Sequence, residues 1–334
     1  MKRILTVIAI LAFASQVCAA EQVTNYKIKR LVSQLYEKSE AMDAQRFLPG
    51  YGKEATPYLL PVIKDTTNEG ARVAALRVLY QIGDPSIEAE IIPLLGDNNH
   101  IVRSEAAKVL SVIGTDKSLE SLKPLVNDFD PEVRYNVLRA LAKISPSGEV
   151  TLLINSLGDF DPRVRQFAVI ALGNIKAKEA IPSFTQMTQD PDPAVRLEVA
   201  KALGKIGTVE CVEGLTRLSG DPEVAVRVEA VNNLYVIPGP EADKSLVAAA
   251  NASDPRMASE AILALGKRKS PDAIAVAKSH LNSEYLDIKL ASIEVLGSLG
   301  GPAEKALLEP LFAAESTKVR KKAQEAVQKL NGRV

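Results

Sequence analysis

Apolar and polar positions alternate along this chain in a pattern that repeats every 31 residues. A basic residue marks each copy, and it recurs at Arg72, Arg103, Arg134, Arg165, Arg196 and Arg227. The same step then reaches Ala258, Lys289 and Arg320. Counted from this position, apolar residues fall at offsets −1, +3, +4, +7 and +10, which is one face of a period of about 3.6 residues. The pattern therefore predicts an amphipathic helix in every copy.

A second, shorter helix is expected ahead of each of these helices. Apolar positions in 86–95, 118–126, 150–157 and 179–187 indicate it. The sequence Asp-x-Asp-Pro, as at Asp128 and Asp159, then offers an N-cap and a proline for the first turn of the longer helix. Because one helical pair cannot bury both of its apolar faces alone, neighbouring pairs must stack.

Stacked pairs account for nearly all of the sequence. About nine copies fill 53–334, and the last turns polar at Lys321, Lys322 and Gln324, as a terminal repeat facing water requires. Residues 21–52 lack the repeat and predict an N-terminal helical cap. One junction is expected to be weaker, near 235–258, where Pro238 and Pro240 interrupt the turn and Ala258 replaces the basic residue.

The full repeat resembles a known family. The pattern Asp-x-Asp-Pro-x-Val-Arg-x-x-Ala-x-x-Ala-Leu-Gly-x-Ile-Gly is similar to the short HEAT-like repeats first grouped with phycobilisome bilin lyases. The segment from Asp190 to Gly207 matches it at every defined position except Val199, which replaces the first alanine. The resemblance implies an all-α, right-handed α-solenoid of the armadillo-like helical type. It is specific for the fold and says little about activity, because the family includes scaffolds, bilin lyase subunits and an iron hydroxylase.

Rows of aspartate and arginine have a structural role in such repeats. An aspartate lies six residues before each of the five arginines from Arg103 to Arg227, and the resemblance implies that these side chains bond between neighbouring repeats as a ladder. The expected members are Asp97, Arg103, Asp128, Arg134, Asp159, Arg165, Asp190, Arg196, Asp221 and Arg227. Anion binding by the arginine row is the weaker alternative.

Positions that the repeat leaves free are the candidates for binding. Offsets +1, +5 and +9, flanked by +2, form a stripe on the longer helix, and in HEAT-like arrays this stripe tends to line the concave side. Aromatic and arginine anchors with a charged rim are typical of a protein-binding surface. The candidates are Arg77, Lys108, Tyr135, Arg139, Lys143, Gln166, Phe167, Ile170, Lys201 and Lys205. The competing interpretation is a solvated face, with Glu105–Lys108 and Glu198–Lys201 as ordinary i,i+3 pairs.

The first twenty residues predict export. Lys2 and Arg3 precede a short apolar run, and Ala19 and Ala20 suit cleavage, so 1–20 are expected to be a Sec-type signal peptide. Cys18 follows Ser-Gln-Val, which fits a lipid-attachment motif poorly and argues against a lipoprotein. No later run is apolar enough to span a membrane. We expect a periplasmic or secreted protein.

Composition narrows the choice of partners and of compartment. Aromatic residues make up only 4% and Trp is absent, which suits thin helices packed through Ala, Leu, Val and Ile. Loss of Lys2 and Arg3 from 41 basic and 41 acidic residues leaves 39 and 41, a net charge of −2. A mildly acidic protein has no overall attraction for nucleic acid. Cys211 would be the one remaining cysteine, so no disulfide within the chain is expected.

The sequence offers little for catalysis. His100 and His280 are the two histidines, and they stand too far apart along a solenoid to share a site. Neither is followed by the glutamate that the related iron enzymes use, and Cys211 has no zinc-ligand neighbours in sequence. Asp128, Asp130, Asp159 and Asp161 could hold calcium, although helix capping explains them better. We expect no metal and no cofactor.

Three hypotheses about function follow. The favoured one is a monomeric, non-catalytic scaffold or adaptor of the cell envelope that binds another protein or peptide on the concave surface of the solenoid. An enzyme or enzyme subunit of the bilin-lyase or iron-oxygenase type rests on the resemblance alone. A purely structural spacer is the third.

Overall fold

A computed structural model describes residues 21–332, and these form helices joined by short turns. The predicted signal peptide, 1–20, lies outside the described residues. By its internal contacts the chain divides into two compact units, which meet between Leu152 and Leu153. None of the helices in the described range is long and apolar enough to cross a membrane.

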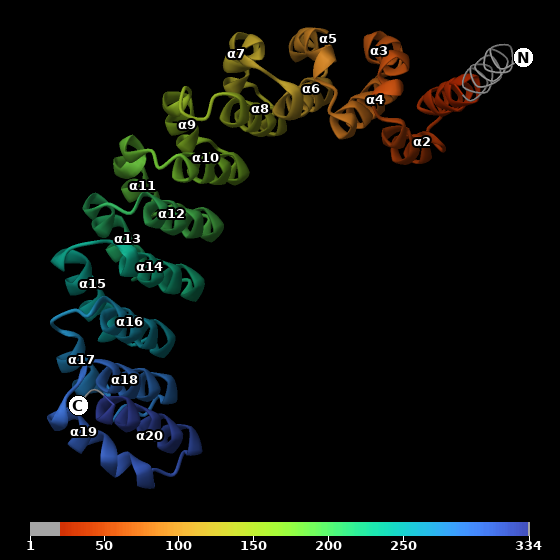
Figure 1. Cartoon of the computed structure of the whole chain (residues 1–334). Coiled ribbons are helices and arrows are strands. Elements are labelled where there is room, and N and C mark those ends of the chain that lie inside the picture. Colours follow the sequence, from red (N-terminus) through yellow and green to blue (C-terminus); the bar gives the residue numbers. More distant parts are fainter. Residues whose placement is uncertain (1–20, 333–334) are drawn as a thin grey trace, which may run out of the picture. The chain divides into compact units, whose positions relative to one another are not determined.

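The first unit begins with the cap and continues with paired helices (Figure 1). Residues 21–34 are helical and are followed by α2 (Ala41–Phe47). The paired helices are α3 (Thr56–Lys64) with α4 (Glu69–Ile82), α5 (Glu88–Ile91) with α6 (His100–Ile113), and α7 (Asp116–Leu122) with α8 (Pro131–Ile144). Helix α9 (Val150–Asn155) contains the boundary between the units.

The second unit holds the remaining helices. They are α10 (Pro162–Asn174), α11 (Ile181–Met187), α12 (Pro193–Ile206), α13 (Val212–Leu218), α14 (Val224–Val236), α15 (Pro240–Ala250), α16 (Pro255–Arg268), α17 (Ala273–His280), α18 (Leu286–Leu299), α19 (Pro302–Leu308) and α20 (Thr317–Asn331). Counting α9 with α10, the described residues contain nine helical pairs, and no strand is assigned among them. The expected all-α solenoid of about nine repeats is confirmed.

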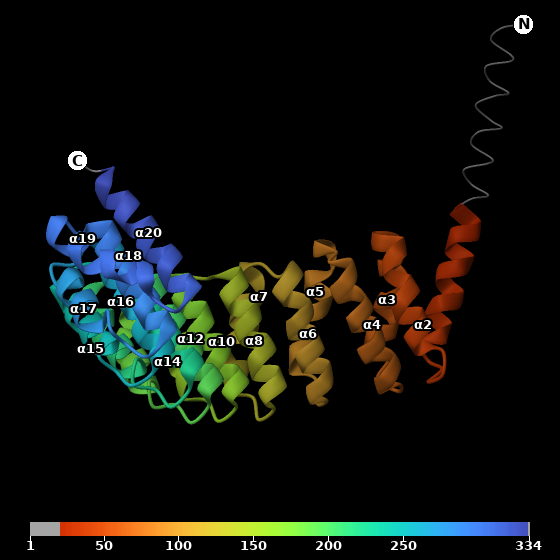
Figure 2. The same cartoon turned by 90° about the horizontal axis from the view of Figure 1, so that it is seen from below.

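Each unit has two layers (Figures 1 and 2). The longer, second helix of every pair packs on the second helices of adjacent pairs in the same unit, such as α4 on α6 and α16 on α18. The shorter first helices form the other layer, and several of them end in a 3₁₀ turn. The leucines at offset +7 lie between the layers with no exposed surface: Leu79, Leu110, Leu141, Leu172, Leu203, Leu234, Leu265 and Leu296.

The second helices begin where the sequence places their caps. The carboxylates of Asp130, Asp161 and Asp192 accept hydrogen bonds from backbone N–H groups in the first turn, and a proline occupies the next position. Gly83 and Gly207 end α4 and α12 in the left-handed conformation, with φ of 64° and 72°, which glycine adopts without strain. The second helices start at a constant interval of 31 residues, from Glu69 of α4 to Thr317 of α20, and this interval keeps equivalent residues in register. The candidate site depends on this register.

Candidate binding groove on the second helices

The arginine and aspartate rows form a bonded ladder. Arg103 donates from Nε and Nη2 to both carboxylate oxygens of Asp128, at 2.8 and 2.9 Å, and from Nη1 to the backbone carbonyl of Asp97 at 2.8 Å. Arg103 therefore joins a carbonyl of its own repeat to the carboxylate of the next. The same arrangement links Arg165 with Asp190 and Arg196 with Asp221, and Arg72 also pairs with Asp97.

Burial makes these pairs structural. The side chains of Arg196 and Asp221 are only 11% and 2% exposed, so the charges depend on each other for solvation. Burial alone would raise the pKa of Asp128, but hydrogen bonds from Arg103 and from the Asp130 N–H together hold that pKa below its usual 3.8. Arginines engaged on both sides in this way have little capacity left for an external anion.

One rung departs from the spacing. The position equivalent to the ladder aspartates is Ala252 in the seventh repeat, and Arg227 instead bonds to Asp254, the N-cap of α16. That carboxylate thus serves both the ladder and the helix start. At the end of the first unit, Arg134 donates to the Asp128 carbonyl at 2.8 Å, and in the second unit the Asp159 carbonyl accepts from Arg165 at 2.8 Å.

Two candidate binding residues of the first unit already have partners. Arg77 on α4 donates to Glu105 at 2.7 Å, and Lys108 lies 3.5 Å from the same carboxylate. The Lys108 ammonium also stands 5.0 Å from the centre of the Tyr80 ring. The i,i+3 pair expected as the alternative interpretation is therefore present. Arg77 nevertheless lines a cavity of about 540 Å³ between the cap and α4.

Three further candidates of the first unit lie together on α8. Tyr135 is half-buried, and the Arg139 guanidinium lies 5.9 Å from the centre of its ring. Arg139 also donates to the side chain of Asn136, which is buried against Ser104 of α6. Lys143 is exposed one turn further on. These contacts order the tyrosine and arginine on the surface of the helix.

The remaining candidates belong to the second unit. Gln166, Phe167 and Ile170 are half-buried on α10. On α12, Lys201 pairs with Glu198 at 2.8 Å, and Lys205 donates to Asn174 of α10 at 2.7 Å. The two lysines are therefore held along the line of the stripe.

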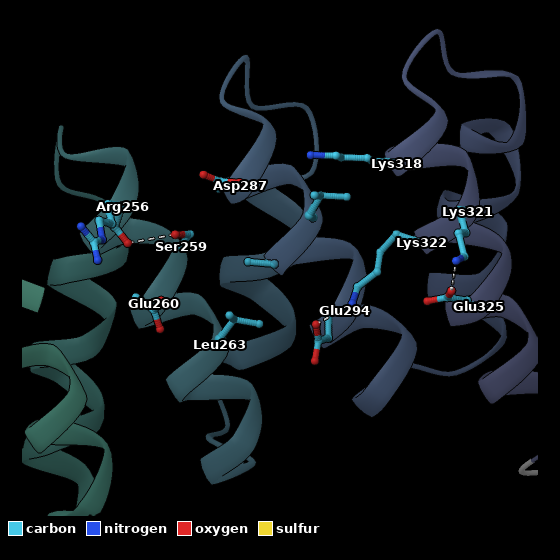
Figure 3. Close-up of a pocket in the computed structure, with 12 residues that line it drawn as sticks. Arg256, Ser259, Glu260, Leu263, Asp287, Glu294, Lys318, Lys321, Lys322 and Glu325 are labelled. Carbon is cyan, nitrogen blue, oxygen red and sulfur yellow. Dashed lines mark hydrogen bonds and ion pairs between the residues drawn. The ribbon is translucent and has the colours of Figure 1, made fainter.

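The stripe forms a groove further along the second unit (Figure 3). A cavity of about 610 Å³ crosses α16, α18 and α20, and the residues around it occupy the same four offsets, −2, +1, +2 and +5, on all three helices. They are Arg256, Ser259, Glu260 and Leu263; Asp287, Leu290, Ala291 and Glu294; and Lys318, Lys321, Lys322 and Glu325. Ser259 and Ala291 have small side chains at offsets where most other repeats carry larger ones, and this leaves the space open.

The sequence-based interpretation identified the stripe but favoured other repeats. It placed the binding surface around Tyr135 and Phe167, because large aromatic rings are unusual in a chain with few aromatic residues. A groove is instead marked by small residues on the stripe, and Ser259 and Ala291 carry that signal in sequence. Another feature passed over is Phe160, in the turn before α10, which is 99% exposed.

The acidic turns function as helix caps and ladder members. Asp130 and Asp161 cap α8 and α10, and Asp128 is bound to Arg103. Within the part of the chain that the structure describes, no group of three or more His, Cys, Asp or Glu side chains is placed to hold a metal ion. His100 lies instead against Asp130, at 2.7 Å, and Cys211 is buried.

Comparisons with known proteins agree with this architecture. The chain is similar to an engineered protein of known crystal structure. The match covers 91% of this chain and 98% of that chain, with 22% sequence identity and a TM-score of 0.51. That likeness shows the fold alone. No curated protein matches the sequence. The family model for HEAT repeats matches 56–142, 150–235, 212–294 and 244–328, which together cover most of the described residues. The chain belongs to the HEAT-repeat family.

Proposed function

We propose that this protein is a non-catalytic scaffold or adaptor that binds another protein along the surface of its second helices. The observation that carries the proposal is the groove across α16, α18 and α20, because equivalent positions of three successive repeats enclose it. A repeated surface of this kind extends over many residues, which suits contact with a chain or a domain better than with a small molecule.

The composition of the groove supports a protein ligand. Leu263 and Leu290 are half-buried among the charged residues, so apolar and ionic contacts are available side by side. Protein-binding surfaces combine an apolar centre with a polar rim in this way. The candidates on α8, α10 and α12 lie on the same stripe and would extend the contact surface within each unit.

The proposal also includes the cell compartment and the assembly state. The signal-peptide pattern in 1–20 supports export, and we place the protein in the periplasm or outside the cell as a monomer without a lipid anchor. The 31-residue repeat supports membership of the phycobilisome-lyase-type group of short HEAT-like repeats.

Site-directed photo-crosslinking tests the proposal in the cells that make the protein. A photoreactive residue at Leu263 or Leu290 should capture a defined protein, identified by mass spectrometry. The same residue at Glu213 or Lys244, which are exposed on the first helices, should not. Products that do not differ between the two layers, or no specific product at all, would favour a spacer without a binding surface.

The enzyme alternative rests on the resemblance to bilin lyases and iron oxygenases. Metal analysis and absorption spectroscopy of the protein purified from its natural source test it directly. Stoichiometric iron or a bound pigment would support that alternative and would require a new account of the acidic turns.

A further inference from the structure

The charged residues of the groove fall into two groups. Lys322 of α20 pairs with Glu294 of α18 at 2.7 Å, and Lys321 lies 4.0 Å from Glu325 within α20. The side chains of Arg256, Asp287 and Lys318 are exposed, and within the described residues none of the three makes an ion pair or a side-chain hydrogen bond. The groove therefore has free charges of both signs along one edge.

These three free charges occupy equivalent positions. Each is the second residue of its helix, in α16, α18 and α20, and each lies two residues before the basic position of the repeat. They follow one another along the same edge of the groove (Figure 3). Read in chain order, the edge is positive, negative, positive.

Helix stability does not explain this order. The N-terminus of a helix carries partial positive charge, which favours an acidic residue such as Asp287 and disfavours a cation. Arg256 and Lys318 are cations in the first turn without an acidic partner among the described residues. Their charges are better explained by a ligand that supplies the carboxylates.

The spacing of the three charges selects the conformation of such a ligand. Packed helices lie about 8–10 Å apart, so the charges are separated by about that distance from one helix to the next. A polyproline II segment rises about 3.1 Å per residue with three residues per turn, so its side chains at i, i+3 and i+6 share one face at intervals of about 9 Å. A β-strand would turn every third side chain to alternate faces.

We propose that the groove binds an extended, polyproline II-like segment of a partner protein that carries an acidic, a basic and an acidic side chain at three-residue intervals. The two carboxylates meet Arg256 and Lys318, the cation meets Asp287, and the residues between them lie on Leu263 and Leu290. This inference rests on the proposed function and names the chemistry of the partner segment.

Fluorescence anisotropy with synthetic peptides tests the charge order. The probes are labelled 11-residue peptides with Ala and Pro spacers. One carries Asp-x-x-Lys-x-x-Asp, one carries the pattern with the sign of every charge reversed, Lys-x-x-Asp-x-x-Lys, and one carries the two-residue spacing Asp-x-Lys-x-Asp. The first peptide should bind the purified chain roughly tenfold more tightly than the reversed one, because three exposed pairs change from attraction to repulsion. The two-residue spacing should lose most of that advantage.

A charge-reversal variant makes the prediction specific to this edge. In the triple variant Arg256→Glu, Asp287→Lys, Lys318→Glu, the reversed peptide should become the tighter ligand by a similar factor. The matched control reverses three exposed charges on first helices, Glu213→Lys, Arg217→Glu and Lys244→Glu, with the same change in net charge, and should keep the wild-type preference. Circular dichroism confirms that both variants are folded.

Several results would overturn the inference. They are equal affinity of the two charge orders, a preference that survives in the triple variant, or no binding of any peptide up to millimolar concentration. If photo-crosslinking from Leu263 still captures a partner in that case, only the charge pattern is wrong and the proposed function stands. If crosslinking also yields no partner, the proposed function fails with it.

Discussion

The ladder aspartate Asp221 is buried so deeply that its loss should lower the stability of the folded protein. Asp221 accepts two hydrogen bonds from Arg196, at 2.7 and 3.0 Å, and both side chains are shielded from water. Removing one partner of a buried pair leaves the other charge unsolvated, which costs about 3–5 kcal/mol. We therefore expect Asp221→Ala to lower the free energy of unfolding by roughly this amount, measured by urea denaturation.

The exposed pair Arg217–Glu213 provides the control for this prediction. Arg217→Ala should change the free energy of unfolding by less than about 1 kcal/mol, because exposed ion pairs contribute little. Combining Asp221→Ala with Arg196→Met should recover part of the loss. Similar effects of the buried and the exposed substitutions would show that the ladder does not stabilise the fold.

The ladder also predicts how stability depends on pH. A hydrogen bond from Arg227 is the main cause that lowers the pKa of Asp254, and the pKa values of Asp97 and Asp128 are lowered as well. A carboxylate whose pKa is lower in the folded chain contributes stability above its unfolded pKa, near 3.8, and that contribution is lost as the pH falls through the folded value. The urea midpoint should therefore fall steeply below about pH 4.

Asp254→Asn isolates this effect at one position. Asparagine keeps the cap of α16, because it ranks with aspartate at the N-cap, but it removes the charge that Arg227 binds. The variant should be less stable than the wild type at pH 7 and should lose less stability between pH 5 and pH 3. A parallel fall in both proteins would contradict the assignment.

The ladder shows what sequence can predict at the scale of a residue. The 31-residue spacing was sufficient to identify the arginines, because every one lies at the same offset in its helix. It did not reveal that Arg227 pairs with Asp254, because Ala252 occupies the expected position and a capping residue replaces it. Whether Asp254 can replace an aspartate at position 252 depends on the distance between its carboxylate and Arg227, which the sequence does not give.

At the scale of the helix, close packing of adjacent second helices depends on glycine. A methyl group on Gly173 of α10 would lie 2.8 Å from the Ala202 side chain and 2.9 Å from its Cα on α12. We expect Gly173→Ala to destabilise the protein by about 1–3 kcal/mol through overpacking, although alanine is the better helix former. Thermal denaturation measures this effect. Gly158→Ala, with no atom within 4 Å of the new methyl, should change stability by less than about 0.5 kcal/mol.

The irregular junction after α14 contains an unexpected connection. Arg268 occupies the position where earlier repeats have isoleucine, and it donates to the Tyr235 carbonyl at 2.8 Å, to the Gly239 carbonyl at 3.1 Å, and to Asp243. The sequence predicted a weak junction near 235–258, because Pro238 and Pro240 interrupt the turn and Ala258 replaces the basic residue. Arg268 compensates by binding the carbonyls that face it.

Hydrogen exchange tests the junction and this residue together. Amides of 235–258 should exchange faster than those of 164–206, as the sequence predicts. Arg268→Leu should raise exchange in the junction by about tenfold further, because several hydrogen bonds are lost. The neighbouring variant Lys267→Ala should leave exchange unchanged. If the amides of 235–258 exchanged as slowly as those of 164–206 in both variants, this explanation of the junction would be contradicted.

At the scale of the molecule, the fold could be predicted almost completely from the sequence. Repetition made the prediction secure, because an error in one copy is corrected by the others. The binding surface was predicted only as a stripe. The depth of the groove depends on the sizes of neighbouring side chains on α16, α18 and α20. The sequence-based prediction instead favoured the repeats that contain the aromatic residues Tyr135 and Phe167.

The central claim is that a partner protein binds in this groove. The most direct measurement is calorimetric titration of the protein captured by crosslinking into the wild-type chain, the triple charge-reversal variant and the matched control variant. Stoichiometric binding should be preserved in the wild type and the control, and weakened by about tenfold or more in the charge-reversal variant. Equal affinity for all three proteins would show that Arg256, Asp287 and Lys318 do not contribute to binding and would contradict the charge pattern assigned to the groove.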